Sequence, residues 1–135
     1  MTIFNTKQKG SYAVGLAIAY YTKLGYVVSI PLNDSQDYDL IVDNGKIESV
    51  QVKFTGSKGA SGNYQVSLRS ISGTTRKEYK AISDSDVDTL FVVTNDSNIV
   101  ILPIKEIVVR TQITITEDLL IKYGVSKDWL SIPFC

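Results

Sequence analysis

Three polar side chains, Asp39, Gln51 and Lys53, have types and spacing that suit phosphate chemistry. They lie in two runs rich in β-branched residues around Asn44-Gly45, a pair typical of β-hairpin turns. A carboxylate and an amide oxygen are hard ligands that suit Mg²⁺, which keeps several waters of its own. A neighbouring lysine can orient an attacking water or offset charge on a phosphate. The alternative is that these residues are only the solvated face of an ordinary strand.

The length of the turn decides which side chains share a face of the hairpin, because the side-chain period of a strand is two. A two-residue turn, Asn44-Gly45, pairs Leu40 with Ser49 and separates Asp39 from Gln51. A three-residue turn, Asp43-Asn44-Gly45 with Gly45 left-handed, pairs Leu40 with Glu48. It gathers apolar side chains on one face: Tyr38, Leu40, Val42, Val50 and Val52. It gathers polar side chains on the other face: Asp39, Ser49, Gln51 and Lys53. Apolar clustering therefore favours the register that brings acid, amide and lysine together.

The elements before this hairpin must position it. Residues 6–24 predict a helix that Asn5 or Thr6 can cap and that ends at Gly25. This helix is apolar almost all round, which predicts burial against a sheet or a partner subunit. A short strand is expected at 26–30.

Further elements follow the hairpin. We expect a strand at 64–68, a second hairpin of central strands at 88–94 and 99–103, and a helix at 117–122 capped by Thr116. Residues 70–79 are polar and predict a loop with a short helical turn. The apolar tail around Trp129, Ile132 and Phe134 either folds back on the core or docks on a second subunit. This order predicts an α/β (α+β) fold, a single domain over 1–135 with a mixed central β-sheet and the N-terminal helix packed on it.

Composition excludes several classes of function. The chain has no histidine, which excludes histidine triads and histidine-rich zinc sites. Its single cysteine, Cys135, fits a reducing, intracellular (cytoplasmic) setting. No apolar run approaches the roughly 20 residues that span a bilayer, so no membrane partner is expected. The glycine-rich segment 56–62 lacks the phosphate-loop pattern, so no nucleotide cofactor is expected.

The charge is unevenly distributed, although 14 basic and 14 acidic residues cancel overall. Residues 46–80 carry seven basic and two acidic residues, a net charge of +5. Such a local excess hints at a polyanionic partner, although surface charge also segregates by chance. The candidates for phosphate contacts are Lys58, Arg69, Arg76 and Lys77.

Between about residue 9 and residue 103 the sequence contains, in this order, Lys-Gly, Gly-Tyr-Val-Val, Pro, Asp, Tyr-Asp-Leu-Ile-Val and Val-Gln-Val-Lys. These segments and the order of elements resemble the PD-(D/E)XK nuclease superfamily. The resemblance is greatest to the group I intron-encoded homing endonucleases, in which Gln replaces the second acid. Many members of the superfamily carry a further acid on the first helix, but the matching segment here, 12–16, has none.

This resemblance implies a restriction-endonuclease-like core and a Mg²⁺-dependent (or Mn²⁺-dependent) endonuclease that cuts double-stranded DNA. By the same resemblance, Asp39, the side-chain oxygen of Gln51 and the carbonyl of Val52 would hold the metal. Lys53 would orient the attacking water. Asp34 would support the metal site or cap a turn.

Cutting both strands needs two active sites, which implies a homodimer or tetramer. The resemblance also implies a bacterial, phage or archaeal setting. One alternative function is that of a Holliday-junction-resolvase-like nuclease. Another is that of a non-catalytic DNA-binding module with a degenerate metal site.

Overall fold

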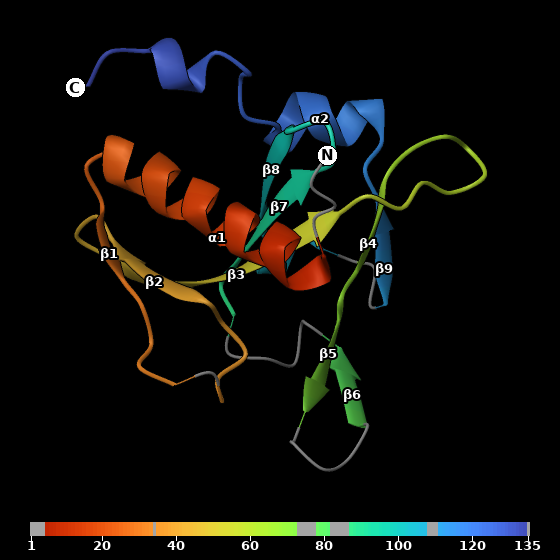
Figure 1. Ribbon diagram of the computed structural model, residues 1–135, viewed down its shortest axis with the longest axis horizontal. Helices are drawn as coiled ribbons and strands as arrows, with labels where there is room; N and C mark the ends of the chain where they lie inside the picture. The colour runs from red at the N-terminus through yellow and green to blue at the C-terminus, as the bar shows by residue number, and fades with distance from the viewer. Residues whose placement is uncertain (1–4, 34, 73–77, 82–86, 108–110, 135) are drawn as a thin grey trace.

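The centre of the protein is a mixed, five-stranded sheet (Figure 1). The computed structural model describes residues 5–33, 35–72, 78–81, 87–107 and 111–134. The strand order is β1-β2-β3-β7-β8, and only the β3–β7 pair is parallel. The strands are β1 (Val27–Ser29), β2 (Leu40–Asp43), β3 (Ile47–Thr55), β7 (Thr89–Thr94) and β8 (Ile99–Pro103). The predicted mixed sheet is therefore confirmed.

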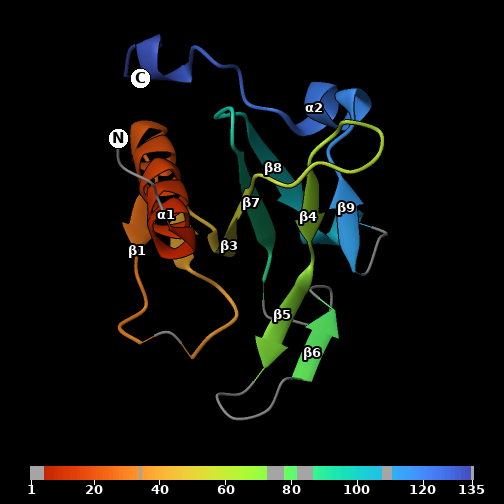
Figure 2. The ribbon, with the colours of Figure 1, turned by 45° about the vertical axis from the view of Figure 1, so that its right-hand side comes forward.

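Helix α1 (Thr6–Lys23) packs on one face of this sheet (Figure 2). Its start is fixed by a capping box: the Asn5 side chain accepts from the Gln8 amide at 2.9 Å, and the Gln8 side chain accepts from the Asn5 amide at 2.8 Å. It ends before Gly25, whose φ of +89° is left-handed. The helix is not buried all round as its composition suggested. Only one stripe, Ala13, Ala17 and Tyr21, is fully covered.

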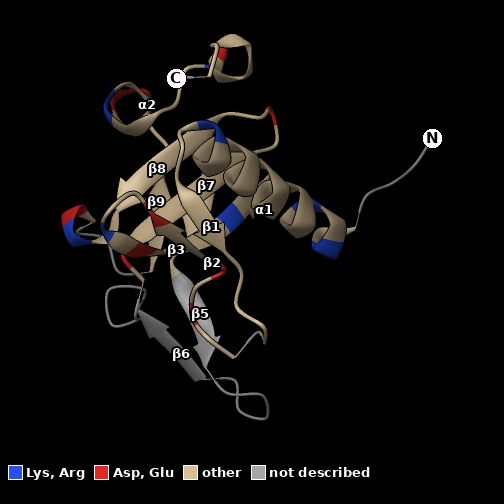
Figure 3. Cartoon of the chain, turned by 90° about the vertical axis from the view of Figure 1, so that its left-hand side faces the viewer, with Lys and Arg blue, Asp and Glu red and all other residues tan. Residues whose placement is uncertain are grey.

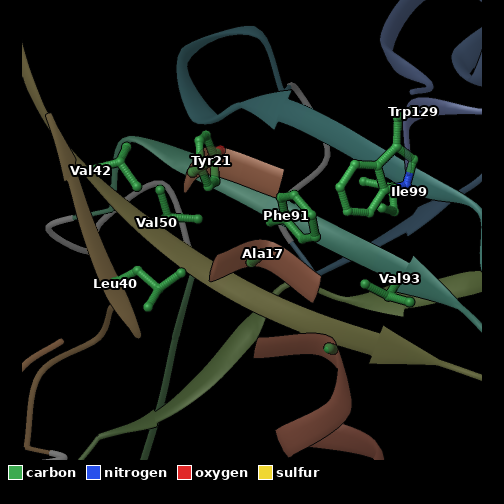
Figure 4. Packing of buried hydrophobic residues seen from close by; sticks show 10 residues of the cluster. Ala17, Tyr21, Leu40, Val42, Val50, Phe91, Val93, Ile99 and Trp129 are labelled. Atoms are coloured by element: carbon green, nitrogen blue, oxygen red, sulfur yellow. The ribbon is translucent and has the colours of Figure 1, made fainter. Parts of the chain in front are cut away.

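The first core lies between this stripe and the sheet (Figure 4). The two alanines let the helix backbone approach the strands closely. Tyr21 and Phe91 then meet with ring centroids 5.8 Å apart. Complete burial of a large apolar side chain such as Phe91 contributes about 1.5–3 kcal/mol to stability. The strand residues in this core are Leu40, Val42, Val50, Phe91, Val93 and Ile99.

The opposite face of the sheet is covered by a second, smaller sheet and a helix. Strands β4 (Gln65–Ser67) and β9 (Gln112–Thr114) pair antiparallel, and α2 (Glu117–Tyr123) follows β9. Thr116 caps α2 as predicted, accepting from the Leu119 amide at 3.2 Å. The second core holds Val66, Leu68, Val87, Leu90, Val92, Val100, Leu102, Ile104 and Ile115. Strand β9 was not expected from the sequence.

Strands β5 (Arg69–Ser72) and β6 (Glu78–Ala81) form a separate antiparallel pair that extends away from the central sheet (Figures 1 and 2). The prediction of a loop with a helical turn over 70–79 is therefore wrong for the described part. Ile71 pairs with Tyr79, and polar residues flank both, the alternation expected of strands. Residues 73–77 lie outside the described residues.

The segment after α2 passes the β8 edge of the sheet and then packs against α1. Strand β8 was expected to be central, but it is the last strand in the order, and Gly124 after α2 forms an isolated antiparallel bridge with Val100. The Val125 amide donates to the Ile99 carbonyl at 2.8 Å. Trp129 then packs edge-on against Tyr20, with centroids 5.5 Å apart, so this part of the tail folds back on the core. Within the described ranges, no helix is long and apolar enough to cross a membrane.

Candidate active site

The β2–β3 hairpin has a register that differs from both registers considered for the sequence. Leu40 pairs with Val50 and Asp43 with Ile47, so the turn is Asn44-Gly45-Lys46. The Asp43 side chain accepts from the Gly45 amide at 2.8 Å. The turn therefore begins at Asn44 instead of Asp43, and this one-residue move of the turn changes the strand pairing by two residues. This register is shifted by two residues from the favoured prediction. A two-residue shift keeps side chains on the same faces, so the predicted grouping on β3 survives.

The polar side chains of β3 lie on the face opposite α1. Gln51 and Lys53 pair in register with Leu90 and Val92 of β7, whose side chains belong to the second core. Ser49 and Gln51 are buried, at 6% and 8% exposure. Buried polar side chains need partners, so their contacts indicate how the site is built.

Asp39 lies where the ladder between β2 and β3 becomes irregular. Its amide donates to the Val50 carbonyl at 2.8 Å, although Val50 already pairs with Leu40. Two successive residues thus face one residue, as in a β-bulge, and bulges redirect side chains. The Asp39 carboxylate turns back and accepts from the Val52 amide at 2.7 Å. The interrupted alternation also explains a correction: Tyr38 packs against the second core, not with Leu40 on the helix side.

Gln51 presents its two polar ends to different surroundings. The Nε2 group donates to the main-chain carbonyl of Asp37 at 2.9 Å. The Oε1 atom is buried and has no hydrogen-bond partner among the described residues. Leaving a buried acceptor unpaired costs about 1–3 kcal/mol. An oxygen held in this way suits a ligand that arrives from outside the chain, such as a cation.

The charged groups at this point are electrostatically coupled. Burial raises the pKa of Asp39, and the hydrogen bond from Val52 and the charge of Lys53 oppose that rise. Burial also lowers the pKa of Lys53, and the charge of Asp39 opposes that change. Both shifts disfavour the ionised forms, so the metal-free protein holds this pair of charges at a cost.

The donors at this site fit a hard cation with few protein ligands. A carboxylate (Asp39), an amide oxygen (Gln51) and the main-chain carbonyl of Val52 are all oxygen donors, which suits Mg²⁺ or Mn²⁺. Across the described part of the chain, no group of three or more His, Cys, Asp or Glu residues could hold a metal. Helix α1 has no acid in its first turn. Asp34 lies outside the described residues.

One contact near the site was not foreseen from the sequence. Asp88 accepts from the amide and the hydroxyl of Ser49, at 2.9 and 3.2 Å, and fastens β3 to the start of β7. The Asp88 amide donates back to the Ser49 hydroxyl at 3.0 Å. The available signal was weak: an acid directly before an apolar strand, with a serine 39 residues earlier.

The predicted phosphate-contact residues are only partly described. The Lys58 ammonium lies 4.8 Å from the centroid of the Tyr64 ring, in the exposed segment between β3 and β4. The backbone of Arg69 belongs to β5, while Arg76 and Lys77 lie outside the described residues. Basic residues also lie at both ends of α1 (Figure 3).

Comparison with known proteins places this chain in a family. The chain is similar to a bacterial homing endonuclease of known structure, with a TM-score of 0.69 and 28% identity over 84% of this chain and 80% of that one. A Holliday junction resolvase from Archaeoglobus fulgidus has the same fold, with a TM-score of 0.57 and 11% identity over 91% of this chain and 95% of the other. A search of curated proteins found no match. The family model of the PD-(D/E)XK endonucleases matches residues 4–120. The chain therefore belongs to the PD-(D/E)XK endonuclease family.

Proposed function

We propose that this protein is a divalent-metal-dependent endonuclease that hydrolyses phosphodiester bonds in double-stranded DNA and acts in homing. The observation that carries this proposal is the unpaired, buried oxygen of Gln51 on the strand that also holds Lys53 and fixes the Asp39 carboxylate. Family membership and the similarity to a homing endonuclease support the reaction class.

In this proposal Asp39, the Gln51 oxygen and the Val52 carbonyl hold Mg²⁺ or Mn²⁺. Such an ion would supply Lewis-acid polarisation of the phosphate and would lower the pKa of a water molecule. The Val52 amide keeps the Asp39 carboxylate in one orientation. The Lys53 ammonium orients the attacking water and offsets negative charge that develops on the phosphate. Its lowered pKa reflects incomplete hydration, which strengthens its interaction with an anion.

The proposed substrate is duplex DNA, and the basic excess of residues 46–80, which lies around and just after the site in the chain, supports a polyanionic partner. Lys58, Arg69, Arg76 and Lys77 are proposed to contact phosphates, which sets affinity without reading sequence. Cleavage of both strands requires two copies of the site, so we propose a homodimer or a larger symmetric assembly.

The test is cleavage of a plasmid pool that carries many different inserts, since a rare-cutting enzyme is silent on one plasmid. Wild type, Asp39→Asn and Lys53→Met are compared in Mg²⁺, Mn²⁺ and chelator. Asp118→Asn and Lys46→Met are matched controls, because they make the same changes at exposed positions outside the site.

We expect metal-dependent cleavage by wild type and both controls, and its loss in both site variants. Cleavage that persists in Asp39→Asn would contradict the proposed site. Salt-sensitive DNA binding without cleavage of any member of the pool would instead favour a non-catalytic DNA-binding module.

A further inference from the structure

The hydrogen bond between Gln51 and Asp37 has a direction that constrains the site. A carbonyl oxygen only accepts hydrogen bonds, so the Asp37 carbonyl can be satisfied only by the NH₂ end of the amide. At 2.9 Å this contact decides which end of the Gln51 side chain is used. The oxygen end is left buried and unpaired.

A glutamate at position 51 would reverse this interaction. An ionised carboxylate only accepts hydrogen bonds, so one of its oxygens would face the oxygen of the Asp37 carbonyl. Side-chain exposure of 8% leaves little water to screen that repulsion. A second carboxylate would also place a like charge beside the strand position where the Asp39 carboxylate is bound.

We propose that the main-chain carbonyl of Asp37 is a positioning group, which holds the Gln51 amide with its oxygen free for a cation and selects an amide over a carboxylate at position 51. The site would then bind a divalent cation with one carboxylate instead of two. The identity of the ligand rests on the proposed function, whereas the orientation of the amide and the selection against glutamate do not.

The chain contains an internal control for this arrangement. In Gln8 the opposite end of the amide is bonded, because its oxygen accepts from the Asn5 amide at 2.8 Å, and the side chain is exposed. The NH₂ protons of Gln8 and Gln51 should therefore differ in hydrogen-exchange rate, and both rates can be measured on one sample. The signals of side-chain NH₂ groups are separate from those of backbone amides, so backbone hydrogen bonds do not affect this comparison.

The first experiment is side-chain amide hydrogen exchange by ¹⁵N NMR on the metal-free, full-length protein. Gln51→Met and Gln8→Met identify the two pairs of resonances by their loss. We expect a Gln51 NH₂ proton to exchange at least about tenfold more slowly than those of Gln8, because it is buried and bonded. Equal exchange rates would overturn the proposal.

Addition of Mg²⁺ to the same sample separates the two proposals. A change in the Gln51 side-chain ¹⁵N shift, with slow exchange retained, would support a bound amide whose oxygen also meets the cation. Slow exchange with no response to Mg²⁺ or Mn²⁺ would support the positioning role of Asp37 and contradict the metal-ligand role of Gln51.

The second experiment is thermal unfolding of Gln51→Glu and Gln51→Met in chelator. Both variants lose the bond to Asp37, but only glutamate adds a repulsive oxygen and a charge. We expect the Glu variant to melt below both wild type and the Met variant. A Gln51→Glu melting temperature equal to those of wild type and Gln51→Met would show that the carbonyl does not select against a carboxylate. That result would overturn the proposal.

Discussion

The two hairpins of the central sheet are built on opposite principles. In the β7–β8 hairpin all six residues of β7 are buried, and the turn is closed by the Thr94 amide bonding the Asn98 carbonyl at 2.9 Å. The Thr94 hydroxyl also bonds the Asp96 carboxylate. The β2–β3 hairpin instead contains a bulge at Asp39, and its buried Gln51 oxygen has no described partner.

The comparison suggests a division of roles. The β7–β8 hairpin stabilises the fold, whereas Asp39 and Gln51 keep polar groups available for a ligand. Proteins commonly hold functional groups in positions that cost stability. We therefore expect changes in β7–β8 to affect unfolding, and changes at Asp39, Gln51 or Lys53 to affect cleavage.

Phe91→Ala should cause the largest loss of stability, about 3–5 kcal/mol, because it leaves a cavity beneath α1 where Tyr20 and Tyr21 now pack. Urea unfolding measures the change. Val27→Ala is the control, since this strand residue is 65% exposed and should shift stability by less than about 0.5 kcal/mol. Similar losses in both variants would refute the assignment of the core.

Lys53→Met should reduce cleavage by about 10²–10³-fold, because it removes the charge that would oppose the phosphate. The metal-free variant should stay folded with little change in stability, since removal of a desolvated ammonium is offset by loss of its attraction to Asp39. Initial cleavage rates and melting temperatures are measured on the same preparation. A variant that loses cleavage only because it unfolds would contradict the division between the hairpins.

Thr94→Val should cost about 1 kcal/mol of stability, because the turn loses a hydroxyl that accepts from the Asn98 amide at 3.0 Å and bonds Asp96. Metal-dependent cleavage by the folded variant should be unchanged. A specific loss of cleavage without a loss of stability would place this turn in the functional region.

Lys58→Ala should weaken DNA binding modestly and reduce the salt dependence of binding by about one unit of slope. Titrations at several salt concentrations measure this. Lys46→Ala serves as the control for the loss of one positive charge. An unchanged slope in Lys58→Ala would remove Lys58 from the proposed DNA-binding surface.

The pH dependence of stability should show a small contribution from Asp39. Its pKa lies above the ordinary value of 3.8, so the folded state binds more protons than the unfolded state between these two values. The contribution of Asp39 to stability is present below its pKa in the unfolded state. It is lost as the pH rises through its pKa in the folded state. Urea unfolding of wild type and Asp39→Asn in chelator should therefore diverge with rising pH, with the variant relatively more stable. A constant difference would contradict the raised pKa.

Local features of the sequence were enough to predict several elements. The N-terminal helix followed from Asn5 and Gly25, which act on groups a few residues away. The face of the hairpin that carries Gln51 and Lys53 followed from strand periodicity, which is insensitive to a shift of two residues.

Features that depend on distant contacts were not predicted. The register is set by the Asp43 side chain in the turn, and the bulge at Asp39 depends on how β3 continues past the first residue of β2, Leu40. The Ser49–Asp88 contact joins strands 39 residues apart. No periodicity in the sequence reports such pairings.

The location of a bound metal would show whether Asp39 and Gln51 form one cation site. Crystals soaked in Mn²⁺ would be measured for anomalous scattering, because Mn²⁺ accepts the same oxygen ligands as Mg²⁺ and scatters anomalously. We expect a peak within about 2.0–2.5 Å of a carboxylate oxygen of Asp39 and of the Gln51 Oε1 atom. We also expect the loss of that peak in Asp39→Asn. A peak elsewhere in wild type, or one that survives this substitution, would contradict this site.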